Sequence, residues 1–445
     1  MAINRRGFVQ AAAAGLTVLG GRNALFGQNA PSNTVRMAVM GCHGKGRGFS
    51  LLKTLASVPG VEVVTVCDVD ARARDEAAAA ILKQTQREPK KETDIRKVLE
   101  DKSVDGVLCA APDHWHATAA LMTMKAGKAI YVEKPCSFNA REGEILVEAQ
   151  AKYGSVFQMG NQRRSSALYH TVIKEIRGGI IGEPRFARCW YAAQRKPIGK
   201  GNKGAAPEWL DWNLWQGPAP RREYQDNVVH YLWHWFHHWG TGECGNNAPH
   251  YVDVARWALD VKFPSRVTSG GGRLFYEGDD WEWFDTQSST FEFPGRKFLT
   301  WEGLSSVSGR PYEGASTGCM IYGLKGSVLF TPKNVCTLFD TAGKVVREWT
   351  SKDAATDATS LTNPSGNLDL AHLGKWAECV RNKDVNTASP VLEAHTSILL
   401  MHLANIAQRT GETVKTDPAT GKLTAGSAGK ELWEREYEKG WEMTV

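Results

Sequence analysis

A glycine-rich loop between two short apolar runs constrains the fold of this chain more than any other feature. The first run, residues 35–41 (VRMAVMG), reads as a strand and leads into the glycine loop of residues 41–48, and a helical pattern covers residues 49–56. The second run, residues 61–67 (VEVVTVC), reads as another strand and ends at Asp68. Strand, glycine loop, helix, strand and acid in this order predict a βαβ unit of the dinucleotide-binding kind.

The residue types in this unit favour a bound dinucleotide. Glycines let the backbone approach a pyrophosphate, and the N-terminus of the next helix offers free N–H groups to it. Gly41 and Gly46 match the first and last glycines of the G-x-G-x-x-G fingerprint, but His43 stands in the middle and Gly44 is displaced by one. Asp68 is placed to accept hydrogen bonds from ribose hydroxyls and would repel a 2′-phosphate, so we expect NAD rather than NADP. Other α/β proteins can also carry a glycine-rich turn.

The alternation of strands and helices continues to residue 159. It predicts an α/β fold that begins with a doubly wound parallel sheet over residues 34–159. Ligands of such sheets bind beyond the carboxyl ends of the strands, where Asp113, His114, His116, Glu133 and Lys134 are expected. The predicted strands are 104–111, 129–132 and 155–159, and the predicted helices are 71–84, 91–100, 117–126 and 140–152, with a loop at 112–116.

Residues 1–30 have the layout of a twin-arginine-type signal peptide. Arg5 and Arg6 precede an apolar stretch that is too short to cross a bilayer as a helix. We expect export to the periplasm or another extracytoplasmic space, with no stable membrane span once the signal is removed near Ala30. A disordered or amphipathic segment and a retained, membrane-tethered signal are the alternatives. Twin-arginine export moves folded proteins, so we expect a tightly held cofactor that is recycled on the protein.

Composition excludes several other classes of function. The net charge of +6 comes from interspersed signs rather than a concentrated basic stripe, so no nucleic-acid partner is expected. The nine cysteines form no C-x-x-C pair, which argues against a disulfide framework and a cysteine zinc site. The 16 tryptophans are compatible with a large core or with stacking on sugar rings.

Further motifs resemble those of the Gfo/Idh/MocA family of oxidoreductases, from about residue 34 to about residue 416. The resemblance implies a second domain over residues 160–445, with an open and mostly antiparallel sheet that commonly buries one face in a homodimer or homotetramer. Strand-like alternation at 262–340 and helical patterns at 367–382 and 391–410 fit this domain. Family members mostly oxidise or reduce one hydroxyl of a sugar, cyclitol or related polyol. The motifs are APDHWH (111–116), GK (127–128), EKP (133–135), GNQR (160–163), LDW (210–212), GPAP (217–220) and IYG (321–323).

The resemblance also implies roles at the reacting hydroxyl. Hydride transfer from an alcohol requires a base for the hydroxyl proton and a positive charge beside the oxygen. The family supplies these with the EKP lysine, here Lys134, and a D-x-x-x-H pair, in which His250 matches the histidine and Asn246 replaces the aspartate. An amide cannot take a proton, so we expect His250 to be the base and Lys134 to stabilise the alkoxide. Asp253, on the same helix face, is expected to orient His250 or to cap a contact.

Two sets of binding residues follow. Substrate contacts are expected from Arg163, Trp235 and His250, and Glu133 is expected to brace the cofactor end of the site. The expected NAD contacts are Gly41, His43, Gly44, Gly46, Arg47, Asp68, Asp113, His116, Glu133, Lys134 and Gln162.

The segment HYLWHWFHHW (230–239) has three readings. It can form a sugar-stacking wall, pack in the core, or bind a metal through His234, His237 and His238. No carboxylate of ligand spacing accompanies these histidines, and the family needs no metal, so no metal site is expected.

Three functions remain open. The first is an NAD-dependent dehydrogenase of a sugar or polyol. The second is an NAD-assisted glycoside-cleaving enzyme that oxidises the sugar transiently, although the family's hydrolase branch usually carries other residues in place of Glu133-Lys134-Pro135. The third is a non-catalytic sugar-binding protein with a relic dinucleotide domain, against which Lys134 and His250 argue.

Overall fold

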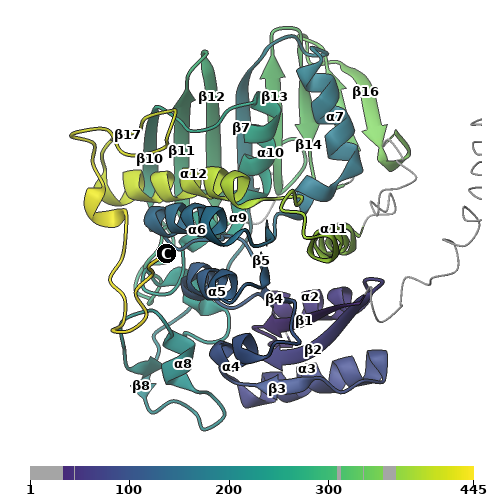
Figure 1. The fold of residues 1–445 in the computed structure, drawn as a ribbon. Coiled ribbons are helices and arrows are strands. Elements are labelled where there is room, and N and C mark those ends of the chain that lie inside the picture. The colour runs from purple at the N-terminus through teal and green to yellow at the C-terminus, as the bar shows by residue number, and fades with distance from the viewer. Residues whose placement is uncertain (1–33, 45, 308–311, 334, 354–366) are drawn as a thin grey trace, which may run out of the picture.

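The computed structural model describes residues 34–44, 46–307, 312–333, 335–353 and 367–445, and begins with a parallel sheet (Figure 1). The strand order is β3-β2-β1-β4-β5-β6, which confirms the predicted doubly wound sheet of Rossmann type. The predicted signal at residues 1–30 lies outside the described residues. The strands are β1 Val35–Met40, β2 Val61–Cys67, β3 Lys90–Glu92, β4 Gly106–Cys109, β5 Ala129–Val132 and β6 Phe157–Met159.

The helices of this domain follow the predicted order with two differences. Residues 91–100 are not one helix but β3 followed by α4, because Asp94 caps a helix that begins only at Ile95. Residues 113–116 are not a loop, since they form the first turn of α5. The helices are α2 Arg47–Leu55, α3 Ala71–Thr85, α4 Ile95–Glu100, α5 Asp113–Lys125 and α6 Ala140–Tyr153.

The second sheet has nine strands in the order β16-β15-β14-β13-β7-β12-β11-β10-β17. Its neighbouring strands are antiparallel except β7 and β12, which confirms the predicted mostly antiparallel sheet. Its members are β7 Pro184–Ala192, β10 Arg266–Gly272, β11 Thr286–Phe293, β12 Lys297–Leu304, β13 Thr317–Gly323, β14 Gly326–Phe330, β15 Val335–Phe339, β16 Val345–Thr350 and β17 Val414–Lys415.

Helices join the two sheets into one body (Figure 1). Helix α10 (Pro249–Leu259) packs on β7 and β13, and α12 (Val391–Thr410) packs on β10 and also on α6 of the first domain. Helix α11 (Leu368–Asn382) returns to the first domain, where Trp376 joins the core beneath α2. The boundary at residue 159 therefore separates the two sheets, while later segments contribute to the core of the first. Helix α7 (Ala167–Arg177) also packs on α10.

A long connection between β7 and α10 forms a separate aromatic cluster beside the first domain. We call residues 193–241 the insertion. It contains β8 (Lys203–Gly204), α8 (Trp212–Gln216), β9 (Tyr224–Gln225) and the short helix η3 (Leu232–Trp235). Half of the buried residues in its core cluster are tryptophans, and Trp281 from the segment before β11 stacks on Trp235 with the ring centroids 4.0 Å apart.

The described residues also bear on membrane spans and on disulfides. In the described residues, no helix is long and apolar enough to cross a membrane. All nine cysteines are buried and free, which agrees with the expectation that they form no disulfide framework.

Candidate active site

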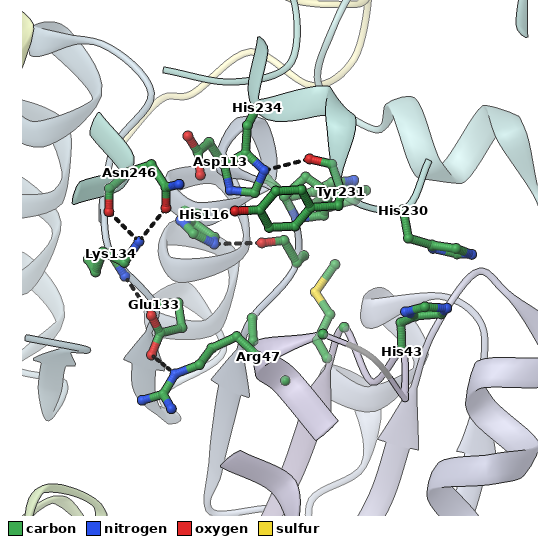
Figure 2. Close-up of a pocket in the computed structure, with 18 of the residues that line it drawn as sticks. His43, Arg47, Asp113, His116, Glu133, Lys134, His230, Tyr231, His234 and Asn246 are labelled. Atoms are coloured by element: carbon green, nitrogen blue, oxygen red, sulfur yellow. Dashed lines mark hydrogen bonds and ion pairs between the residues drawn. The ribbon is translucent and has the colours of Figure 1, made fainter. Parts of the chain in front are cut away.

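A cavity of about 710 Å³ lies at the carboxyl ends of the parallel strands, facing the second domain (Figure 2). This is the edge at which doubly wound sheets bind their ligands. It is lined by the glycine loop, by the ends of β2, β4 and β5, by α9 (Gly242–Asn247) and α10, and by the insertion. Most of the predicted site residues meet here: Gly41, His43, Gly46, Arg47, Asp68, Asp113, His116, Glu133, Lys134, Gln162, Arg163, Asn246 and His250.

Two glycines hold the loop tightly against the sheet. Gly41 has φ +83°, and a Cβ there would lie 2.6 Å from the carbonyl of Ala110. A Cβ on Gly48 would lie 1.7 Å from the Gly41 oxygen, so α2 can approach β1 only through glycine. Gly48 was missed by the sequence reading, although it stands two residues after Gly46. Gly44 is not among the described residues that line the cavity, and a Cβ there would meet the carboxylate of Glu76, so its contact with a cofactor stays a prediction.

The loop and the end of β2 fit a dinucleotide. Within the described chain no side chain caps α2 and no acid stands in its first turn, which leaves the helix N-terminus open to a phosphate. The Asp68 carboxylate accepts hydrogen bonds from the backbone N–H groups of Cys42 (2.6 Å) and Asp70 (2.9 Å). Each carboxylate oxygen has two lone pairs, so both can accept ribose hydroxyls as well. Burial raises the pKa of Asp68 to about 6.

Lys134 stands at the end of β5 and reaches across to the second domain. Its Nζ donates to the backbone oxygen of Asn246 (2.7 Å) and to Asn246 Oδ1 (2.9 Å), as Figure 2 shows. Burial lowers the pKa of Lys134, while the charges of Glu133 and Asp113 oppose that shift. The replacement of the family aspartate by Asn246 therefore gives Lys134 a neutral partner that holds its position.

His250 lies in the first turn of α10, directly after Pro249. Its buried Nδ1 has no hydrogen-bond partner among the described residues. Burial lowers its pKa well below the usual value, and the charges of Arg163 and Lys134 lower it further. The imidazole is therefore neutral at neutral pH.

Asp113 and His116 join the two halves of the site through α5. Asp113 Oδ2 accepts hydrogen bonds from the backbone N–H (3.1 Å) and hydroxyl (2.5 Å) of Thr241. His116 has one ring nitrogen 2.7 Å from the Pro135 oxygen and the other 2.7 Å from the Ala111 oxygen. These contacts fix the two strand ends that carry the polar residues.

Glu133 and Arg47 form the floor of the cavity. Arg47 Nε lies 3.5 Å from Glu133 Oε1 (Figure 2). The Arg47 guanidinium also donates to both oxygens of Asp369 in α11. A Cβ on Gly160 would lie 2.5 Å from Glu133 Oε1, so a side chain there would displace the Glu133 carboxylate. Asp369 was missed because α11 approaches this edge only in the folded chain.

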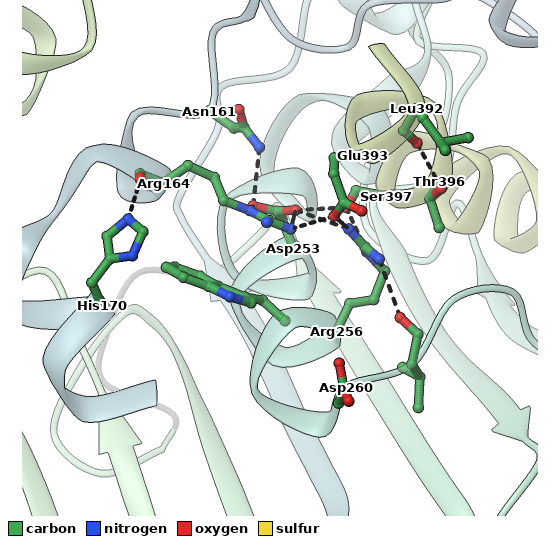
Figure 3. Close-up of polar contacts among 12 residues, drawn as sticks. Asn161, Arg164, His170, Asp253, Arg256, Asp260, Leu392, Glu393, Thr396 and Ser397 are labelled. Atoms are coloured by element: carbon green, nitrogen blue, oxygen red, sulfur yellow. Dashed lines mark hydrogen bonds and ion pairs between the residues drawn. The ribbon is translucent and has the colours of Figure 1, made fainter. Parts of the chain in front are cut away.

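Arg163 and Arg164 have different surroundings. Arg163 lines the cavity with its guanidinium 4.2 Å from the centre of the Tyr251 ring. Arg164 turns away and holds Asp253 with two bonds of 2.8 Å (Figure 3). Asp253 is 1% exposed and also accepts from Asn161 (3.0 Å). The expectation that Asp253 orients His250 is therefore wrong, because its carboxylate serves a buried ion network.

The histidine- and tryptophan-rich segment (230–239) reaches the cavity with only some of its side chains. Trp235 is 1% exposed and is not among the described residues that line the cavity, so the structure does not support its predicted substrate contact. The side chains of this segment that do reach the cavity are His230, Tyr231, Trp233 and His234, joined by Arg195.

His234, His237 and His238 lie in different surroundings and do not meet at one point. His234 Nδ1 lies 2.6 Å from the Tyr231 oxygen, and burial lowers its pKa to about 3. His238 Nε2 lies 2.7 Å from the Pro220 oxygen, and His237 faces a different, smaller cavity. The helix-like spacing of these residues does not bring them together, because the short helix η3 ends at Trp235.

The chain matches two family models, one over the first domain and one over part of the second. Residues 35–161 match a model described as "Oxidoreductase family, NAD-binding Rossmann fold", named GFO_IDH_MocA. Residues 191–269 match its companion, "Oxidoreductase family, C-terminal alpha/beta domain".

Individual relatives extend this similarity over parts of the chain. A glycosyl hydrolase family 109 protein of Saccharopolyspora erythraea is 28% identical over 256 residues, which are 55% of this chain and 50% of that protein. The inositol 2-dehydrogenase of Salmonella paratyphi B is 34% identical over 139 residues, 31% of this chain and 40% of that protein. The chain thus spans about half the length, or less, of these curated relatives.

A solved structure shows the same fold at low sequence identity. Levoglucosan dehydrogenase, in complex with NADH and levoglucosan, superposes with a TM-score of 0.63 at 17% identity, covering 86% of this chain and 99% of that one. The two matched models identify an NAD-binding Rossmann domain and part of a C-terminal domain of the Gfo/Idh/MocA oxidoreductase family in this chain, and the solved structure shows the same overall fold.

Proposed function

We propose that the protein is an NAD-dependent oxidoreductase that moves a hydride between a hydroxyl-bearing carbon of a sugar or polyol and NAD. The observation that carries the proposal is that Lys134, from the first domain, and His250, from the second, line one cavity with the glycine loop. The similarity to inositol 2-dehydrogenase supports the class of substrate.

Lys134, His250 and Asn246 have different roles at the reacting hydroxyl. NAD, when bound, accepts the hydride. Lys134 places a positive donor beside the hydroxyl oxygen and stabilises the alkoxide as the proton leaves. His250 takes that proton, because it lines the cavity and its imidazole is neutral. Asn246 orients Lys134 through its two oxygen contacts.

A substrate screen tests this proposal. Purified protein is incubated with a panel of sugars, polyols and glycosides, and the fluorescence of the reduced nucleotide is followed. We expect a subset of compounds to raise the signal in the wild type and no compound to do so in His250→Phe. A protein that neither binds NAD nor reduces it with any compound would contradict the proposal.

The similarity to a family 109 glycosyl hydrolase over 256 residues favours a second candidate. In it, oxidation of a sugar hydroxyl acidifies the neighbouring C–H, the glycosidic bond is cleaved, and the hydride returns to the sugar. No net NADH accumulates in such a cycle. Glycosides assayed with and without an added electron acceptor separate the two candidates, since only the second releases free sugar without one.

Export and assembly complete the proposal. Arg5 and Arg6, followed by an apolar stretch, support twin-arginine export with a resident, recycled NAD. Cell fractionation of an Arg5→Lys, Arg6→Lys double variant tests it, and export at the wild-type level would contradict it.

A homodimer or homotetramer is proposed by resemblance to the family, and light scattering of the purified protein tests it.

A further inference from the structure

Part of the insertion is fastened to the end of β2, beside Asp68. The backbone N–H of Ala71 donates to the Trp209 oxygen (2.9 Å), and that of Asp211 donates to the Val69 oxygen (3.0 Å). This short antiparallel bridge brings the insertion against the start of α3. The contact lies at the edge of the cavity where Asp68 would receive the ribose, which gives the insertion a direct influence on that end of the site.

Three side chains from separate segments converge next to this bridge. They are His43 of the glycine loop, Asp70 at the start of α3 and His230 of the insertion. Each offers one nitrogen or oxygen atom, and these atoms all lie within 4.8 Å of one another. His43 and His230 also line the main cavity, as their positions in Figure 2 show.

The contact between His230 and Asp70 is close to the spacing of two neighbouring metal ligands. His230 Nε2 is buried and lies 2.9 Å from Asp70 Oδ2, as in an ion pair. Zinc binds imidazole nitrogen and carboxylate oxygen at about 2.0–2.2 Å, so adjacent ligand atoms of a tetrahedral site lie about 3.3–3.6 Å apart. A separation of the two atoms by about half an ångström would therefore admit an ion bound to both.

His43 supplies the third donor after a small movement. Its ring stacks on that of His230 with centroids 3.8 Å apart and an angle of 16° between the planes. Ring lone pairs lie in the ring plane, so the nitrogens of stacked rings run side by side rather than converging. A turn of the partly exposed His43 side chain brings both nitrogens to one ion.

Asp70 is shared with Arg72, which donates to both of its oxygens at 3.2 and 3.0 Å. A carboxylate offers about four lone-pair sites, so it can serve a guanidinium and an ion together. The Arg72 side chain is 58% exposed and rests on the Trp209 ring at 3.4 Å, which leaves it free to yield space.

We propose that His43, Asp70 and His230 form a site for a divalent transition metal such as Zn²⁺. Two nitrogens and one carboxylate suit zinc and its neighbours rather than Mg²⁺ or Ca²⁺, which prefer oxygen ligands. The ion ties the insertion to the glycine loop and to α3 across the edge of the cavity. The functional part of this inference rests on the proposed NAD site. If NAD binds there, the metal link across the edge of the cavity slows its release.

Metal titration of the full-length protein tests the site. The protein is stripped with a chelator, and Zn²⁺ and Co²⁺ are titrated by calorimetry and by the visible bands of Co²⁺. We expect one equivalent to bind the wild type, and at least tenfold weaker binding to His230→Phe, which keeps the stacked ring, and to Asp70→Asn, which keeps the helix-capping oxygen. His237→Phe, a histidine of the same insertion outside the cluster, is the matched control and should bind like the wild type.

The outcomes separate this site from the proposed function. No binding to the wild type, or equal binding to wild type and to a His230→Phe variant with wild-type circular dichroism, overturns the metal site. Nucleotide release is then timed by fluorescence with and without Zn²⁺, and equal rates overturn the link to the cofactor. A protein that binds Zn²⁺ but no NAD overturns the proposed function while supporting the metal site.

Discussion

Replacing Lys134 with methionine removes the charge at the reacting hydroxyl and keeps an unbranched apolar side chain. The substitution deletes the two bonds from Nζ to Asn246, at 2.7 and 2.9 Å. Asn246 is 8% exposed, so its two oxygens lose a donor in a place that water reaches poorly. We expect effects on both catalysis and stability, and their sizes can be separated.

The catalytic effect should be much the larger. Removal of one preorganised donor from a developing negative charge costs about 2.7–4 kcal/mol, or roughly 10²–10³ in kcat. The free energy of unfolding should fall by about 1–3 kcal/mol, the cost of leaving a buried acceptor without its donor. Part of that loss is offset, because the substitution also removes a buried ammonium group whose charge is costly to desolvate.

Lys128 is a matched control at the opposite end of β5. Its Nζ donates to the oxygens of Asp101 (2.7 Å) and Val104 (2.8 Å), and burial lowers its pKa as it does for Lys134. Lys128→Met should therefore reduce the free energy of unfolding by a similar amount and leave kcat within about threefold of wild type, because no reacting group lies nearby.

Turnover of the best compound from the screen and urea unfolding are measured for wild type and both variants. We expect similar losses of stability in both variants and a large loss of kcat in Lys134→Met alone. A Lys134→Met protein that keeps kcat within tenfold of wild type would refute the role of the charge. Equal losses of kcat in both variants would show that the effect is structural.

Three further outcomes follow from the described contacts. Burial raises the pKa of Asp68 to about 6, so its carboxylate is protonated as the pH falls through 6, and NAD binding measured by fluorescence should weaken there in wild type. Gly48→Ala would place a Cβ 1.7 Å from the Gly41 oxygen, and it should abolish NAD binding or cost about 3 kcal/mol or more in urea unfolding. Asp253→Asn leaves Arg164 without its buried counter-charge and should cost about 3–5 kcal/mol in the same assay.

Each of these has a control on the same chain. Asp68→Asn should bind NAD with no pH dependence near 6, and an unchanged dependence would exclude Asp68 as its source. Gly204→Ala meets open space and should behave as wild type. Glu183→Gln breaks an exposed pair with Arg185 and should change stability by less than about 1 kcal/mol, so an equal loss in Asp253→Asn would remove the case for a buried network.

Local sequence order was enough to predict the first domain and much of its site. The glycine loop between β1 and α2 is determined by near neighbours, and the carboxyl ends of parallel strands must meet at one edge. For that reason Asp68, Asp113 and Lys134 could be assigned to one cavity from their positions after β2, β4 and β5.

Errors arose where one segment had to be placed against a distant one. Trp235 and Trp233 are two residues apart in a short helix, and the sequence does not say which of them faces the cavity and which stacks on Trp281. Asp253 shares a helix with His250, yet its partner is Arg164 from the segment after β6.

The amino-acid sequence by itself was enough to identify the dinucleotide-binding unit and the resemblance to the family, and to predict the lysine–histidine pair, because these depend on local patterns and motif spacing. Only the tertiary structure decided which residues close the site from outside, including Asp369, Arg195 and the His43–Asp70–His230 cluster. The physical reason is that the insertion and α11 pack on the first domain through many weak, non-local contacts. No periodicity or spacing along the chain encodes where the side chains of the insertion and of α11 lie in the folded protein.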